Sequence, residues 1–117
     1  MPGQKLVLYG LKNCDTCKKA KRALEEAGDT VQFVDIRDET DLAAKVPVWL
    51  KAAPEKLVNK SSTTWRNLTN GDKAKVGTQG EFQLLIKYPT LIKRPVIEAG
   101  RAVHVGWGKD VQGALLK

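Results

Sequence analysis

The sequence predicts an α/β fold: a four-stranded mixed sheet with helices on both faces and a helical insert between the second and third strands. Three observations predict it. Within residues 5–36, an apolar run, an amphipathic helical pattern and a second apolar run follow one another, and such a strand–helix–strand unit implies parallel pairing. Two short apolar segments flank residues 99–101, which is typical of a hairpin. The region between these two parts has a broken helical pattern.

The first part of the chain has the clearest pattern. Residues 5–9 predict a buried strand, and a helix is expected from Thr16, with small and apolar side chains recurring at helical spacing at Cys17, Ala20, Leu24 and Ala27. Gly28 is a C-terminal stop signal for this helix. Residues 31–36 then predict the second strand.

The middle of the chain predicts short helices. Pro47 and Pro54 each suit the first turn of a helix better than its interior. Residues 61–66 are polar and are expected to form a loop. Thr78 and Glu81 have the spacing of a capping box. It would open a helix through Lys87 that buries Phe82, Leu85 and Ile86.

The end of the chain predicts a hairpin and a final helix. Residues 96–98 and 102–105 are the expected hairpin strands, and residues 110–116 the expected helix. With a Cys-x-x-Cys motif at the first strand–helix junction, the complete order is the thioredoxin-like arrangement. The length of 117 residues predicts a single domain over 1–117, with the helical insert at about 40–88.

Composition narrows the range of partners. The formal charge is +7, but Lys and Arg are spread along the chain and aromatic residues are only 6 %. We therefore expect no direct nucleic-acid binding, and an attraction to small anionic substrates or an acidic protein instead. There is neither a long apolar run at the start nor a later one of about 20 residues. These features predict a cytoplasmic protein without membrane contact, and the lack of a heptad pattern favours a monomer.

The two cysteines are the main chemical signal. Cys14 and Cys17 are the only cysteines and lie three positions apart where the helix begins. A thiol attacks as the thiolate, and the unpaired N–H groups at a helix N-terminus favour that anion. Lys12, Lys18 and Lys19 could add positive potential, whereas Asp15 opposes it. We expect Cys14 to have a lowered pKa and to be the nucleophile, and Cys17, on the core face, to be more thiol-like and to resolve the mixed disulfide.

Two other interpretations of the pair stay open at this point. Buried cysteines often serve only as core packing. A zinc site would need further ligands, and His104 is the only histidine. We therefore expect no bound metal.

Arg94 and Pro95 form the second signal. Pro95 stands at a strand entrance, where it cannot donate to the sheet. In thioredoxin-like folds the matching position is a cis-proline beside the catalytic cysteine. Arg94 would then point toward Cys14 and could hold a carboxylate, phosphate or arsenate. Arg66 is a weaker candidate anion ligand.

Three stretches of the sequence resemble the ArsC/Spx family, the arsenate-reductase-like branch of thioredoxin folds, with the YffB-like subgroup as the most similar. They are residues 9–20 (YGLKNCDTCKKA), 59–68 (NKSSTTWRNL) and 89–97 (PTLIKRPVI). The resemblance implies that Cys14 is the nucleophile, that Arg94 binds an oxyanion and that Pro95 is cis. The substrate-binding candidates are Lys12, Asn13, Arg66, Arg94 and Pro95.

The resemblance implies a glutathione-linked thiol reductase that holds no bound cofactor and uses glutathione as co-substrate. A glutaredoxin-coupled arsenate reductase is an alternative, but such enzymes use two further arginines, at positions near Asn59 and Val105, where this chain has none. Cys17 departs from the YffB-like pattern and is similar to the Cys-x-x-Cys switch of Spx-type regulators. That similarity implies a second alternative, a redox sensor that binds RNA polymerase.

Overall fold

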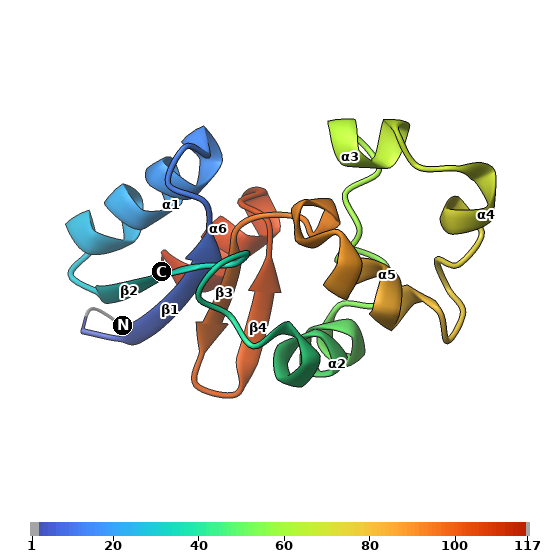
Figure 1. Ribbon diagram of the computed structural model, residues 1–117. Coiled ribbons are helices and arrows are strands. Elements are labelled where there is room, and N and C mark those ends of the chain that lie inside the picture. The colour runs from blue at the N-terminus through green and yellow to red at the C-terminus, as the bar shows by residue number, and fades with distance from the viewer. Residues whose placement is uncertain (1–2, 117) are drawn as a thin grey trace. The chain divides into compact units, whose positions relative to one another are not determined.

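The computed structural model describes residues 3–116. They fall into two compact units (Figure 1). The first consists of the chain up to Thr40 and from Arg94 onward, and the second is Asp41–Lys93. The second unit carries the helices that separate the second and third strands, as predicted for the insert.

The first unit contains the sheet. Strands β1 (Lys5–Gly10), β2 (Thr30–Asp35), β3 (Val96–Ala99) and β4 (Ala102–Val105) lie in the order β2-β1-β3-β4. Strands β1 and β2 are parallel, whereas β1–β3 and β3–β4 are antiparallel. The mixed sheet of the predicted thioredoxin-like fold is therefore confirmed.

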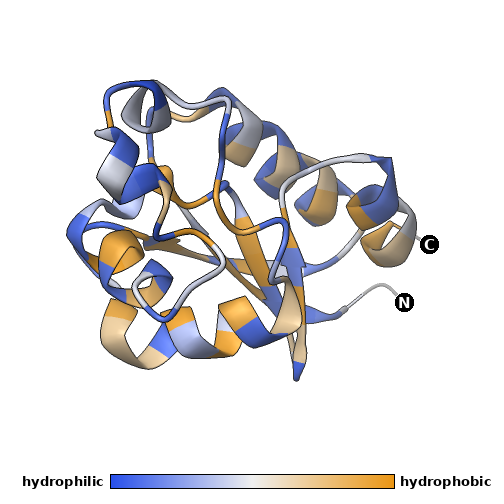
Figure 2. Ribbon diagram, turned by 90° about the vertical axis from the view of Figure 1, so that its right-hand side faces the viewer, coloured by the Kyte–Doolittle hydropathy of each residue, from blue (hydrophilic) through white to orange (hydrophobic). Residues whose placement is uncertain are grey.

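Helices α1 (Asp15–Glu26) and α6 (Lys109–Leu115) pack on one face of this sheet. Side chains alternate between the faces of a strand, so β1 presents Leu6 and Leu8 to the two helices. The shared core contains Leu6, Leu8, Cys17, Ala20, Leu24, Ile97, Val111 and Leu115. Figure 2 shows the same amphipathic pattern, with hydrophobic residues concentrated in the strands and mixed colouring on the helices. Of the four residues predicted to face inward, only Ala27 is exposed, and it lies just after the helix as its C-cap.

Helix α2 (Leu42–Ala52) corrects the expectation for the two prolines. Pro47 lies inside this helix and not in its first turn. The helix begins earlier because the Asp41 side chain caps it by accepting the Ala44 N–H. The apolar face of Leu42, Val46 and Trp49 is buried, which outweighs the hydrogen bond that proline omits. Pro54 lies in a turn after the helix and begins none.

Helices α3 (Thr63–Arg66) and α4 (Asn70–Lys73) are short. The first corrects the loop expected over residues 61–66. The helix forms because the Ser62 hydroxyl caps it by accepting the Trp65 N–H. The polar composition of the segment does not by itself indicate this cap.

Helix α5 (Glu81–Lys87) ends where predicted, but the expected capping box does not form. The N-cap is Gly80, and the Thr78 hydroxyl accepts the Gly80 N–H outside the helix. Glu81 is buried because its carboxylate accepts the Gly77 N–H. The inward face is therefore rotated: Leu84 and Leu85 are fully covered, whereas Phe82 and Ile86 are only partly covered. A short 3-10 helix, η1 (Pro89–Leu91), follows.

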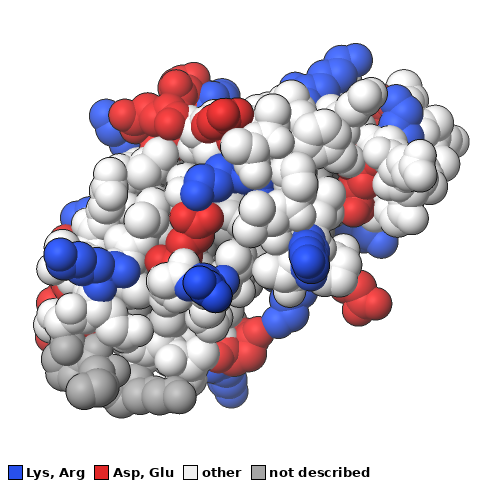
Figure 3. All heavy atoms as spheres, turned by 90° about the horizontal axis from the view of Figure 1, so that it is seen from below, with Lys and Arg blue, Asp and Glu red and all other residues white. Residues whose placement is uncertain are grey.

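No helix within residues 3–116 has the length and apolar character needed to cross a membrane. On the face drawn in Figure 3, acidic and basic side chains are interspersed.

Candidate active site

Cys14 sits where strand β1 passes into helix α1. Its backbone N–H donates to the Leu11 carbonyl at 3.1 Å, closing a tight turn, and its own carbonyl accepts the Lys18 N–H at 3.1 Å. Cys14 is therefore the N-cap of α1, next to backbone N–H groups that have no partner within the helix. Its side chain is partly exposed, so a substrate sulfur can reach it.

The surroundings of Cys14 favour its thiolate. Burial, the largest influence, raises the pKa of the Cys14 thiol, but hydrogen bonds from the Cys17 thiol and backbone N–H lower it. The guanidinium of Arg94 lowers it further, through a hydrogen bond and through its positive charge. Together these donors hold the pKa below the ordinary value of 9.0. The direction is the one expected from the sequence, but the lysines near Cys14 are not among the causes.

Cys17 lies one turn further on, in the opposite environment. Its side chain is fully buried among the core residues. Burial raises the pKa of the Cys17 thiol most, and the hydrogen bond to Cys14 and the Cys14 charge add to the rise, which reaches about 12. The Leu11 N–H and the Arg94 charge oppose this only in part. At neutral pH, Cys17 is therefore a protonated hydrogen-bond donor to the Cys14 sulfur.

Gly10 makes this arrangement possible, and the sequence did not single it out. A Cβ atom on Gly10 would lie 2.5 Å from the Cys17 sulfur, closer than side-chain atoms pack. The last residue of β1 must therefore lack a side chain for Cys17 to occupy its place. The only signal in the sequence is a glycine ending an apolar run just before the cysteine motif.

Arg94 and Pro95 lie immediately before strand β3. The Arg94–Pro95 peptide bond is cis, as predicted. The Pro95 carbonyl accepts the Gly106 N–H at 2.8 Å, which ties this turn to the end of β4. The Arg94 side chain hydrogen-bonds the Cys14 sulfur, so two segments 80 positions apart in the chain meet at one atom.

The remaining candidates occupy different places. Lys12 and Asn13 are exposed in the turn that ends at Cys14. Arg66 is exposed in helix α3 of the second unit, where its guanidinium donates to the Thr63 hydroxyl at 3.1 Å. Within residues 3–116, no group of three or more His, Cys, Asp or Glu side chains is arranged to hold a metal ion.

The sheet order, together with a cysteine pair at the first helix and a cis-proline before the third strand, defines a protein of the thioredoxin-fold class. Within that class the chain belongs to the ArsC family, whose model matches residues 9–114. The solved structure of the YffB protein superposes with a TM-score of 0.84 at 33% identity, covering 96% of this chain and 99% of that one.

Two relatives extend the comparison. An uncharacterized protein of Haemophilus influenzae is 38% identical, over 93% of this chain and 97% of its own length. The global transcriptional regulator Spx of Listeria monocytogenes is 27% identical, over 90% of this chain and 82% of its own length. The chain is thus similar over most of its length to proteins of the YffB and Spx kinds.

Proposed function

We propose that the protein is a thiol-dependent reductase that uses Cys14 as its nucleophile and glutathione as its co-substrate. One observation carries the proposal. A partly exposed sulfur receives hydrogen bonds from the Cys17 thiol, the Cys17 N–H and the Arg94 guanidinium. Donors fixed around a sulfur stabilise its anion, which is the form that attacks a disulfide.

The reaction begins with a substrate thiol that is joined to glutathione in a mixed disulfide. The Cys14 thiolate attacks the glutathione sulfur, forming a Cys14–glutathione disulfide and breaking the original S–S bond. The substrate sulfur leaves with the bonding electron pair and takes a proton from water. Arg94 lies where it can pair with an anionic group of the bound substrate.

The second half of the reaction returns Cys14 to its reduced state by one of two routes. A second glutathione thiolate attacks the glutathione sulfur bound to Cys14, releasing oxidised glutathione. Alternatively, Cys17 loses its proton and attacks the Cys14 sulfur, releasing reduced glutathione and leaving a Cys14–Cys17 disulfide. Two further glutathione molecules then reduce this disulfide in successive exchanges, which restore both thiols and release oxidised glutathione. Two of the causes that raise the Cys17 pKa are the hydrogen bond to Cys14 and the Cys14 charge. Both end once Cys14 is in a disulfide, so Cys17 becomes easier to ionise at that stage.

The Cys14–Cys17 pair also supports a second candidate, a redox-sensing regulator of the Spx kind. The similarity to Spx over 90% of the chain favours it. Here the disulfide would change binding to a protein partner such as RNA polymerase. Pull-down with the oxidised and reduced protein tests this: disulfide-dependent capture without turnover of any thiol substrate would favour the regulator.

Arg94 beside a reactive sulfur also suits arsenate, so an arsenate reductase that works with glutathione and glutaredoxin is the remaining enzyme candidate. Arsenate-dependent turnover in the presence of both would identify it. Each of these reactions needs a supply of reduced thiol, which is the reason for proposing a cytoplasmic location.

The decisive experiment measures reduction of a glutathione mixed disulfide by the purified wild-type protein, coupled to glutathione reductase. The proposal predicts turnover that is saturable in glutathione. A wild-type protein with no activity on glutathione mixed disulfides above the uncatalysed exchange rate would overturn it.

A further inference from the structure

A cavity of about 440 Å³ lies beside the Cys14 turn, within the first unit. One wall is the turn after β1 and the other is the segment after β2, and together they contribute Leu11, Lys12, Asn13, Asp35, Arg37, Asp38 and Glu39. The two strands are parallel, with Gly10 paired to Asp35, so both segments leave the sheet at the same edge. The cavity therefore opens at the end of the sheet that carries the nucleophile.

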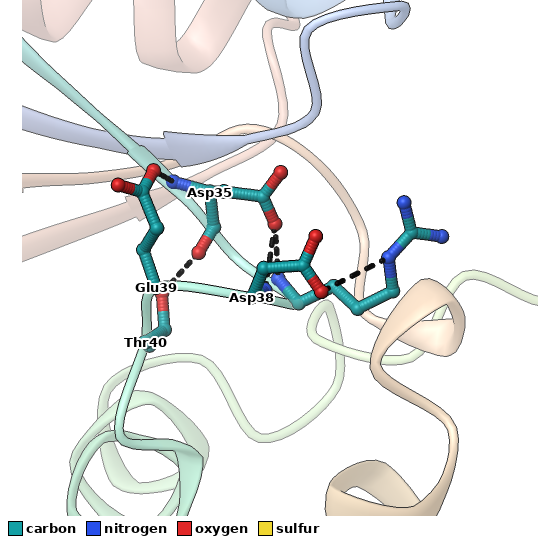
Figure 4. Close-up of polar contacts among 5 residues, drawn as sticks. Asp35, Asp38, Glu39 and Thr40 are labelled. Carbon is teal, nitrogen blue, oxygen red and sulfur yellow. Dashed lines mark hydrogen bonds and ion pairs between the residues drawn. The ribbon is translucent and has the colours of Figure 1, made fainter.

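The wall formed by residues 35–40 is tightly ordered (Figure 4). The Asp35 carboxylate accepts the N–H groups of Arg37 and Asp38, both at 2.8 Å. The Glu39 carboxylate accepts the Asp35 N–H at 3.0 Å, and the Thr40 hydroxyl donates to the Asp35 carbonyl at 2.8 Å. A turn fixed by four hydrogen bonds holds its charged groups in place before a ligand arrives.

Asp35 carries a negative charge at neutral pH. The Asp38 N–H lowers the pKa of the Asp35 carboxyl most, against a rise from burial, and the Arg37 N–H and the charges of Arg37 and Lys12 lower it further. Those charges also show that a cationic side chain from each wall lies near this carboxylate.

The cavity thus presents groups of both signs. Within residues 3–116, no hydrogen bond or ion pair engages the side chains of Lys12 and Asn13. The Arg37–Asp38 pair is exposed, with 3.7 Å between Arg37 Nε and Asp38 Oδ1, and such pairs contribute little. A phosphate or arsenate would be repelled by the carboxylates of Asp35, Asp38 and Glu39. An amino-acid head with an ammonium and a carboxylate on one carbon matches the set instead.

We propose that this cavity binds the zwitterionic amino-acid head of a peptide thiol of the glutathione type while its sulfur is joined to Cys14. The ammonium would face Asp35, and the carboxylate would face Lys12 and Asn13. Lys12 and Asn13 are two and one positions before Cys14, so the cavity begins roughly 4–8 Å from the Cys14 Cα. In glutathione, one amide and two methylene groups lie between the cysteine unit and the carbon that carries the ammonium and the carboxylate, so the head can reach from Cys14 to this cavity. The inference rests on the proposed reaction of Cys14.

The test compares three disulfides in single-turnover reactions with reduced wild-type protein: glutathione disulfide, its N-acetylated form and bis(2-hydroxyethyl) disulfide. In each, Cys14 attacks one sulfur, the S–S bond breaks and the other half leaves as a thiolate. We expect the second-order rate constant for glutathione disulfide to exceed that for the N-acetylated form about tenfold, since acetylation removes the ammonium. The uncharged disulfide reports the intrinsic reactivity of Cys14.

Two matched variants localise the effect. Lys12→Gln should lower the rate constant with glutathione disulfide roughly tenfold, whereas Lys19→Gln, an equal charge change on an exposed α1 residue outside the cavity, should not. In a Cys14→Ser background, S-methylglutathione should shift the amide NMR signals of residues 11–13 and 35–39. Lys12 makes no contact that the fold depends on, so loss of folding does not obscure the result.

The outcomes separate the two proposals. Equal rate constants for glutathione disulfide and its N-acetylated form would overturn the subsite while leaving the Cys14 chemistry intact. Equal losses in Lys12→Gln and Lys19→Gln would also overturn it, by showing only a general attraction of charge. Failure of all three disulfides to react would instead refute the proposed function itself.

Discussion

The turn at residues 11–14 and the core face of helix α1 place the two cysteines in opposite surroundings, although they are one helical turn apart. Cys14 is partly exposed and faces hydrogen-bond donors, which lower its pKa. Cys17 is fully buried in an apolar cluster, and its pKa rises to about 12. The buried thiol serves as a donor to the exposed one, so the core directly supports the reactive site. The contrast between them is the basis of the proposed chemistry.

The largest expected effect comes from removing the attacking sulfur. Cys14→Ser should lower turnover of a glutathione mixed disulfide by roughly 10³-fold or more, because no other group replaces a nucleophile. Thermal unfolding of the variant should stay close to that of the wild type, since Cys14 is not fully buried. Retained turnover in a correctly folded Cys14→Ser protein would contradict the assignment.

The next largest effect is expected from Arg94, which stabilises the Cys14 thiolate but does not belong to helix α1. Arg94→Gln should raise the Cys14 pKa and lower the rate of thiolate alkylation at pH 7 about tenfold, since it removes a charge-assisted hydrogen bond. Arg94→Lys keeps the charge and should lose less. The measurement is the pH dependence of iodoacetamide reaction, and identical profiles for all three proteins would remove Arg94 from the site.

Gly10 tests whether the core sets the position of Cys17. Gly10→Ala should destabilise the protein by about 1–3 kcal/mol, as overpacked cores do, and raise the Cys14 pKa by displacing its donor. Gly113→Ala in helix α6 is the matched control, because a Cβ there meets nothing within 4 Å. The control should be stabilised by about 0.5–1 kcal/mol. Urea denaturation measures both, and equal responses would show that the space at Gly10 is unimportant.

The effect that is smallest at neutral pH concerns the pH dependence of stability, in which the two cysteines have opposite signs. A lowered pKa means that Cys14 adds stability as pH rises through its folded-state pKa toward 9.0. A raised pKa means that Cys17 subtracts stability as pH rises from 9.0 toward about 12, because only the unfolded thiol ionises there. The loss is at most about 1.4 kcal/mol per pH unit. Cys17→Ser should lose stability less steeply above pH 9 in urea denaturation, and parallel curves would contradict the raised pKa.

Short-range patterns were sufficient to predict part of the site. The Cys14–Cys17 spacing, the apolar face of α1 and the Arg94–Pro95 pair each lie within a few residues, so their consequences could be read locally. The close packing of Gly10 on Cys17 and the cavity lined by Asp35 could not, because the first depends on how α1 packs against β1 and the second on the parallel strands β1 and β2 ending at one edge. Pro47 shows the same limit in the second unit, where burial of Trp49 outweighs the local cost of proline.

The most direct test of the account is a titration of the Cys14 thiolate by its ultraviolet absorbance in the wild type, Cys17→Ala and Arg94→Gln. The account predicts a wild-type pKa below 9.0 and higher values in both variants, because each removes donors to the sulfur. A wild-type Cys14 that titrates at or above 9.0, or one whose pKa is unchanged in both variants, would contradict it.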